Sequence, residues 1–192
     1  MNASTDDRRV RKTKRALREG LAELMLEKDL RKITVRELSD KVDIHRATFY
    51  AHYTDIYDLY EELENTLIDE IGVIFAGNTS NTYGSIFRPV VEYVHDNAKT
   101  CRMFFSQNGN RRFYNRISAF VEKAYYDIWV NETGQKTMTE EWWILVRYHI
   151  QGCLAIINRW VDNDFDYPKD EIAELLIKVD IHFEKIMPVE TK

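Results

Sequence analysis

The most informative stretch of this chain is residues 33–53, Ile-Thr-Val-Arg-Glu-Leu-Ser-Asp-Lys-Val-Asp-Ile-His-Arg-Ala-Thr-Phe-Tyr-Ala-His-Tyr. Thr34 and Glu37 match a capping box, in which the Thr hydroxyl accepts from the amide of the residue three positions on. The pattern therefore predicts a short helix that begins after Thr34. Residues 42–44 have the composition of a turn, and a second short helix is expected over 45–52. A short helix, a tight turn and a second short helix form the layout of a helix-turn-helix.

The flanking segments predict further helices. Apolar residues recur at helical spacing over 8–28, and residues 1–7 are expected to be frayed. Thr54 and Asp55 predict the cap of a helix over about 56–75, and Thr137 with Glu140 predicts a second capping box. Other helices are expected near 86–97, 99–106, 111–132, 140–161 and 168–187. Because no segment alternates at period two, we predict an all-α chain of about nine helices, three in an N-terminal head and six in a C-terminal body.

The composition is that of a globular protein. The 192 residues are 44% hydrophobic and 31% charged, which is too apolar for intrinsic disorder. The longest uncharged run in the second half, 148–158, is too short to span a bilayer, and the Arg-rich start lacks the apolar core of a signal peptide. We therefore expect a cytoplasmic protein. Cys101 and Cys153 are expected to be buried free thiols, with a redox sensor as the alternative.

Charge is distributed unevenly along the chain. Residues 1–56 hold 13 Lys+Arg against 10 Asp+Glu, whereas residues 57–192 hold 14 against 22, so a net charge of +3 precedes one of −8. The basic part is concentrated in one predicted helix, at Arg8, Arg9, Arg11, Lys12, Lys14, Arg15 and Arg18. A basic end on an acidic body orients a molecule toward phosphate. The alternative is a merely solvated helix face.

The predicted helix-turn-helix resembles that of a known family. The run Arg46-Ala-Thr-Phe-Tyr-Ala-His52, after a Thr34-capped helix, resembles the TetR/AcrR family of bacterial one-component regulators, and the resemblance is close over about 8–66. In the body, Tyr148-His-Ile-Gln-Gly152 and the residues after it resemble the C-terminal domain common in Firmicutes members. The resemblance implies a homodimer with two DNA-reading heads, whose bodies dimerise and hold a small-molecule effector.

Two positions depart from the family pattern. Asp43 occupies a turn position that usually carries Gly and tends to need a left-handed backbone, which Asp tolerates at some cost. Ile56 stands where the family often has a Lys, so one phosphate contact is expected to be missing.

The resemblance assigns DNA roles to seven residues. Thr34 and Arg36, at the start of the first short helix, suit phosphate oxygens. His45 and Arg46 open the second helix, where Arg46 can take guanine O6 and N7 bidentately. The remaining three are Thr48 for a base or a thymine methyl, and Tyr50 and His52 for phosphates. Packing of the head against the next helix is the alternative for Tyr50 and His52. Phe49 is expected to be core.

The body carries the remaining implied sites. We expect a DNA-binding domain over 1–55, linked through a helix over 56–76, and an effector-binding and dimerisation domain over 56–192. The candidate effector residues are Phe75, Phe104, Phe105, Phe120, Tyr125 and Trp142, with ordinary core aromatics as the alternative. The candidate dimer residues are Trp143, Val146, Ile150, Ile157, Leu175, Val179 and Phe183.

The sequence favours a regulator over an enzyme. It contains no phosphate-binding glycine loop, nucleophile elbow or finger-like metal spacing, so no cofactor and no metal are expected. The leading hypothesis is a homodimeric, ligand-responsive transcriptional repressor that binds a near-palindromic double-stranded operator and does not associate with a membrane. The alternative is a TetR-like coregulator that acts by protein–protein interaction without strong DNA binding.

Overall fold

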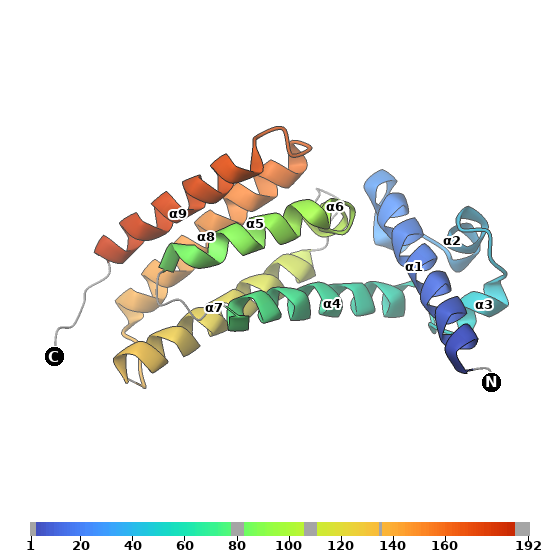
Figure 1. Cartoon of the computed structure of the whole chain (residues 1–192), viewed down its shortest axis with the longest axis horizontal. Coiled ribbons are helices and arrows are strands. Elements are labelled where there is room, and N and C mark those ends of the chain that lie inside the picture. The colour runs from blue at the N-terminus through green and yellow to red at the C-terminus, as the bar shows by residue number, and fades with distance from the viewer. Residues whose placement is uncertain (1–2, 78–82, 106–110, 135, 187–192) are drawn as a thin grey trace. The chain divides into compact units, whose positions relative to one another are not determined.

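A computed structural model describes residues 3–77, 83–105, 111–134 and 136–186 of the chain (Figure 1). The described part is all-helical, as predicted, with nine α-helices and two short 3₁₀ helices. The elements, in order, are α1 Ala3–Glu27, η1 Leu30–Lys32, α2 Val35–Lys41, α3 Arg46–Tyr50, α4 Ile56–Gly77, η2 Tyr83–Ile86, α5 Phe87–Asp96, α6 Ala98–Phe105, α7 Arg111–Thr133, α8 Glu140–Asp162 and α9 Lys169–Ile186.

The chain forms two compact units, and each has its own apolar core. The first unit comprises residues 1–67 and 99–110, and the second comprises 68–98 and 111–192. The first core is built on Leu17, Leu21, Met25, Leu38, Phe49 and Leu59, and the second on Phe113, Ile117, Val146, Ile150 and Leu176, all of them almost fully buried. In the second unit, α9 packs against α5, η2 and α8, and α8 packs against α7.

The first helix starts earlier than its apolar periodicity indicates. Residues 3–7 were expected to be frayed, but α1 begins at Ala3. Those residues contribute no apolar face, so periodicity alone cannot detect them.

The first half of the predicted helix-turn-helix is capped as expected. The Thr34 hydroxyl accepts from the Glu37 amide at 3.2 Å, and the Glu37 carboxylate forms an ion pair with Lys28, which directly follows α1. Gly20 allows the close approach of α1 to α2, since a Cβ at this position would lie 2.3 Å from Val42 Cγ1. A contact that short requires the Val42 side chain or its backbone to shift.

The turn has the backbone that the sequence indicates. Asp43 has φ 54°, which lies in the left-handed region usually occupied by Gly. The Ile44 amide donates to the Ser39 carbonyl at 3.0 Å and closes the turn. The departure from Gly therefore leaves the helix-turn-helix geometry in place.

In the second unit, one predicted helix end is confirmed and one predicted cap is wrong. Gly134, with φ 69°, follows the end of α7, as expected. The second capping box at Thr137 and Glu140 is not formed, because Thr139 is the cap of α8 and its hydroxyl accepts from the Trp142 amide at 3.3 Å. This start places Glu140 and Glu141 in the first turn, where carboxylates favour the helix dipole.

Candidate nucleic-acid interface

The second short helix, α3, separates a buried residue from exposed ones. Phe49 is fully buried, as predicted, and its ring lies 5.7 Å from that of Tyr53. His45, Arg46 and Tyr50 are exposed, and Tyr50 retains 58% of its accessible surface. One apolar side chain therefore anchors a five-residue helix and leaves its cationic and aromatic side chains at the surface.

The other predicted contact residues of the head are accessible to different degrees. Thr48 and His52 are half-buried, and the His52 ring lies 6.4 Å from that of Tyr53. Thr34 is exposed and Arg36 has a side-chain exposure of 73%. The Arg36 guanidinium lies 3.7 Å from the Asp40 carboxylate, which is too far for a hydrogen bond.

The position that departs from the family pattern after α3 belongs to the core. Ile56 is 5% exposed at the start of α4, so an apolar contact replaces a surface cation. Asp55 caps this helix, as predicted, by accepting from the Asp58 amide at 2.9 Å. Asp58 in turn accepts from the amide and hydroxyl of Thr54, at 2.8 and 3.1 Å.

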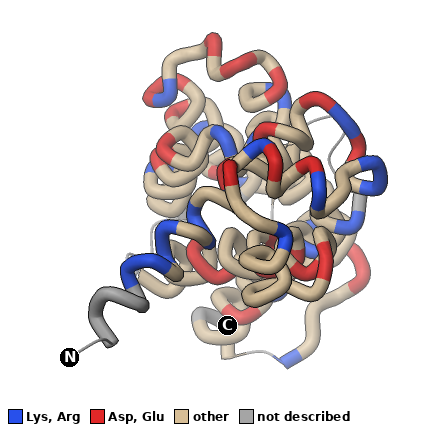
Figure 2. Tube along the Cα trace, turned by 90° about the vertical axis from the view of Figure 1, so that its right-hand side faces the viewer, with Lys and Arg blue, Asp and Glu red and all other residues tan. Residues whose placement is uncertain are grey.

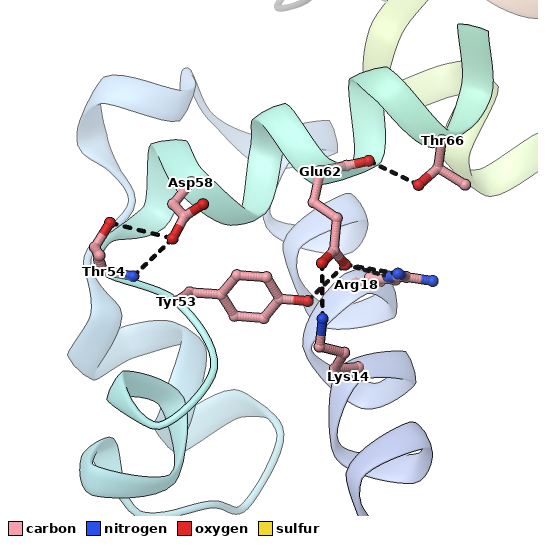
Figure 3. Close-up of polar contacts among 7 residues, drawn as sticks. All are labelled: Lys14, Arg18, Tyr53, Thr54, Asp58, Glu62 and Thr66. Atoms are coloured by element: carbon pink, nitrogen blue, oxygen red, sulfur yellow. Dashed lines mark hydrogen bonds and ion pairs between the residues drawn. The ribbon is translucent and has the colours of Figure 1, made fainter. Parts of the chain in front are cut away.

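A polar network joins α1, α4 and the segment after α3, and its centre is Glu62 (Figure 3). The Glu62 carboxylate accepts from Lys14 Nζ at 2.8 Å, from Arg18 Nη2 at 2.6 Å and from the Tyr53 hydroxyl at 2.7 Å. The Lys14 ammonium also lies 5.2 Å from the centre of the Tyr53 ring. All of these residues belong to the first unit.

The network shifts the titration of two of its members. Burial alone raises the pKa of Glu62, but the hydrogen bonds from Lys14, Arg18 and Tyr53 outweigh it and lower the pKa to about 2. Burial and the bond to the Glu62 carboxylate together raise the pKa of Tyr53. At neutral pH the acceptor is therefore charged and the phenol keeps its proton.

Basic residues recur along α1 (Figure 2). Arg8, Arg9, Arg11 and Lys12 are exposed, and so is Arg15, which pairs with Glu19 one turn away at 2.7 Å. Lys14 and Arg18 are about one-third exposed because Glu62 holds them. The cations of α1 thus fall into an exposed group and a group bound by α4, a division that their spacing in the sequence does not reveal.

The predicted effector residues are divided between the two units. In the second unit, the rings of Phe75 and Phe120 meet edge to face with centroids 6.1 Å apart. Tyr125 donates to Asp180 at 3.1 Å, and Trp142 lies 5.6 Å from Trp129. Phe104 and Phe105 belong to the first unit, where Phe104 packs on Tyr60 at 5.2 Å.

The predicted dimer residues differ in accessibility within the single chain. Val146, Ile150, Ile157 and Phe183 are buried, Trp143 and Val179 are half-buried, and Leu175 is 42% exposed. An exposed face of α8 that was not predicted lies beside them and consists of Ile144, Tyr148, Gly152 and Ala155. Ile144 and Tyr148 are 61% and 76% exposed. Their spacing of four, four and three residues was visible in the sequence, but burial by the rest of the chain was not.

Together, the capped α2, the left-handed turn and the exposed α3 define a helix-turn-helix protein, a class that reads DNA with its second helix. The family comparisons extend this assignment to the body. Residues 81–179 match the TetR_C_8 family model, described as a transcriptional regulator C-terminal region. The chain therefore belongs to the TetR family of transcriptional regulators.

Individual relatives agree with this assignment. The chain is 23% identical over 165 residues to YxbF, an uncharacterized HTH-type transcriptional regulator of Bacillus subtilis, and the match covers 82% of this chain but 42% of that protein. A TetR transcriptional regulator of Streptococcus agalactiae has a similar fold, with a TM-score of 0.65, 21% identity and coverage of 92% of this chain and 98% of its own. A regulator of Aquifex aeolicus gives a TM-score of 0.64 at 15% identity, with coverage of 91% and 99%.

The length and polarity of the helices decide whether any of them could span a membrane. Within the described ranges, none of them combines the length and the apolar character needed to cross a bilayer.

Proposed function

We propose that this chain is a homodimeric, DNA-binding repressor of the cytoplasm that a small-molecule effector releases from its operator. The observation that carries the DNA-binding part is the geometry of α3, in which Phe49 is buried while His45, Arg46 and Tyr50 are exposed. A recognition helix needs an anchored inner side and an outer side free to enter the major groove.

The DNA contacts that we propose fall into two groups. Arg46 and His45 read base edges at the start of α3, and Thr48 contacts a base or a thymine methyl. The phosphate-binding group consists of Thr34, Arg36, Tyr50 and His52. The exposure of Tyr50 supports a DNA role over packing within the head. The exposed cations of α1 add sequence-independent attraction to the duplex.

We propose that α8 and α9 form the dimer interface. The exposed face of α8 and Leu175 of α9 supply apolar surface that the single chain leaves uncovered. The open position at Gly152 supports close helix packing, since among the described residues a Cβ there would meet no atom within 4 Å. Val146, Ile150, Ile157 and Phe183 then support the interface from beneath. A two-fold dimer predicts a near-palindromic operator with half-sites spaced by one or more turns of about 34 Å.

The effector-binding part of the proposal rests on aromatic side chains of the second unit. The rings of Phe75 of α4 and Phe120 of α7 meet edge to face, and Gly72 gives the Phe120 ring room, since a Cβ there would lie 3.3 Å from it. An aromatic wall between two helices suits an apolar small molecule. Native mass spectrometry of the purified protein tests both the retained ligand and the dimer, and Tyr148→Glu should shift the mass from dimer to monomer.

A coregulator without strong DNA binding is the second candidate. The burial of Ile56 favours it, because this head lacks one surface cation that the family often has. The left-handed Asp43 opposes it, because the turn that positions α3 is retained.

A direct binding experiment separates the two candidates. Purified protein is titrated at two salt concentrations into duplexes selected from a random-sequence library and into DNA from upstream of its own gene. A repressor should enrich a near-palindromic sequence and bind it more than about a thousandfold more tightly than random DNA. Equal binding to all duplexes, or none at the lower salt, would leave the coregulator as the better account.

A further inference from the structure

The Glu62 carboxylate of α4 binds two cations of α1 and the hydroxyl of Tyr53, which follows α3 by three residues. Its Oε1 accepts from both Arg18 and Tyr53, and its Oε2 accepts from Lys14 (Figure 3). The side chain is 29% exposed, so it is partly shielded from competing solvent.

The connection to the recognition helix runs through Tyr53. Its amide donates to the Phe49 carbonyl at 3.0 Å, its ring packs against the Phe49 ring, and it is 3% exposed. Phe49 is the buried anchor of α3. The bond from the Tyr53 hydroxyl to Glu62 at 2.7 Å therefore fixes the anchor of the recognition helix to α4.

The same carboxylate also neutralises part of the positive charge of α1. Lys14 and Arg18 would otherwise add to the cations that attract any duplex, whatever its sequence. Binding them to Glu62 compensates part of this charge and holds both side chains against α4. Sequence-independent affinity grows with the number of cations that reach phosphates, whereas discrimination depends on how accurately base-reading side chains are placed.

We propose that Glu62 is a positioning residue for sequence-specific recognition, which holds the anchor of α3 in place while it withdraws Lys14 and Arg18 from non-specific contact with DNA. This inference rests on the proposed DNA-binding function. It assigns to Glu62 an effect on the ratio of specific to non-specific affinity, which is distinct from an effect on folding alone.

The principal variant is Glu62→Gln, which keeps the size of the side chain and removes its charge. Lys14 and Arg18 are then free to reach phosphates, so the logarithmic salt dependence of binding to random DNA should steepen by about 0.9 to 1.8 per head. Affinity for random DNA should rise. The ratio of specific to non-specific affinity should fall about tenfold, as expected when a bidentate base contact is partly lost.

Two further variants separate the contributions of charge and position. Glu19→Gln removes a carboxylate from the exposed Arg15–Glu19 pair of α1, with the same change in net charge and no change to Tyr53. It should raise the affinity for random and selected DNA alike and leave the ratio of the two near that of the parent. Tyr53→Phe deletes the hydroxyl and keeps the buried ring, so it should lower the ratio without steepening the salt dependence.

The experiment compares the full-length parent and the three variants by fluorescence anisotropy, with the best duplex selected from a random library and with a scrambled duplex of equal length. Thermal melts confirm that each variant is folded. A parental ratio retained by both Glu62→Gln and Tyr53→Phe would overturn the inference while leaving the proposed function intact. A parent that discriminates between no sequences would overturn both.

Discussion

Replacing Arg36 with alanine should weaken DNA binding in a way that depends on salt but not on sequence. In the structure the side chain is 73% exposed and its i,i+4 contact with Asp40 is 3.7 Å long. An exposed pair of this kind stabilises a helix by about 0.2–0.5 kcal/mol. Removing Arg36 should therefore leave the fold almost unchanged, and any large effect on binding would come from lost phosphate contact.

The size of the effect follows from counting charges. Each phosphate contact contributes about 0.9 to the logarithmic salt dependence, so a dimer that loses one contact in each head should lose about 1.8. Raising the salt concentration from about 50 to 200 mM should therefore weaken binding by the variant about twelvefold less than binding by the parent. Selected and scrambled duplexes should be affected alike, because phosphate contacts carry no sequence information.

The assay is fluorescence anisotropy with both duplexes over that range of salt, and the second unit supplies a matched control. Lys123 is also 73% exposed and pairs with a carboxylate four residues on, Asp127. Lys123→Ala therefore makes the same change in charge in a comparable helical setting. The assignment of Arg36 would be refuted if the two variants had equal salt slopes, or if Arg36→Ala impaired binding to the selected duplex alone.

Four more predictions concern the packing and chemistry of the fold. Asp43→Gly should raise the free energy of unfolding by a few tenths to about 1 kcal/mol in chemical denaturation, because Gly adopts φ 54° without the Cβ clash; a loss of stability would contradict this. Gly20→Ala should cost about 1–3 kcal/mol in the same assay, since its Cβ would lie 2.3 Å from Val42, and an unchanged midpoint would show that α2 can move away freely. The pKa of Glu62 is lowered from 4.5 to about 2, so its contribution to stability is complete above pH 4.5 and is lost as the pH falls toward 2. The difference in the free energy of unfolding between the parent and Glu62→Gln should therefore shrink over that range. A difference independent of pH would argue against the ion pairs. Burial and the nearby Asp180 raise the pKa of Cys153 to about 12, so its thiol is protonated and shielded at pH 8. In a Cys101→Ser background, a thiol reagent at pH 8 should therefore react with Cys153 only after unfolding. Rapid reaction of the folded protein would support a redox role.

Local signals in the sequence were sufficient for much of the head. The cap at Thr34, the strained turn at Asp43 and the inward Phe49 each depend on residues within a few positions of one another. The same kind of signal gave the wrong cap at α8, where Thr137 was predicted and Thr139 is the cap. The favourable position of two carboxylates in the first turn agrees with the choice of Thr139.

The Glu62 network could not be predicted, for a physical reason. Its two cations lie 48 and 44 residues away in sequence, so the ion pairs form only after α1 packs against α4. The amphipathic patterns of both helices are compatible with several rotations about their axes. Burial on α8 posed the same difficulty, since the pattern identifies an apolar residue but not whether its own chain or another covers it.

The brevity of α3 has a consequence for how such a protein diversifies. Phe49 is the buried residue of this five-residue helix, so its outward side chains make few packing contacts with the core. If α3 reads the operator as proposed, substitutions at these positions can change the DNA sequence that is recognised without compensating changes in the core, so duplicated genes can diverge in the promoters they control while the fold stays the same.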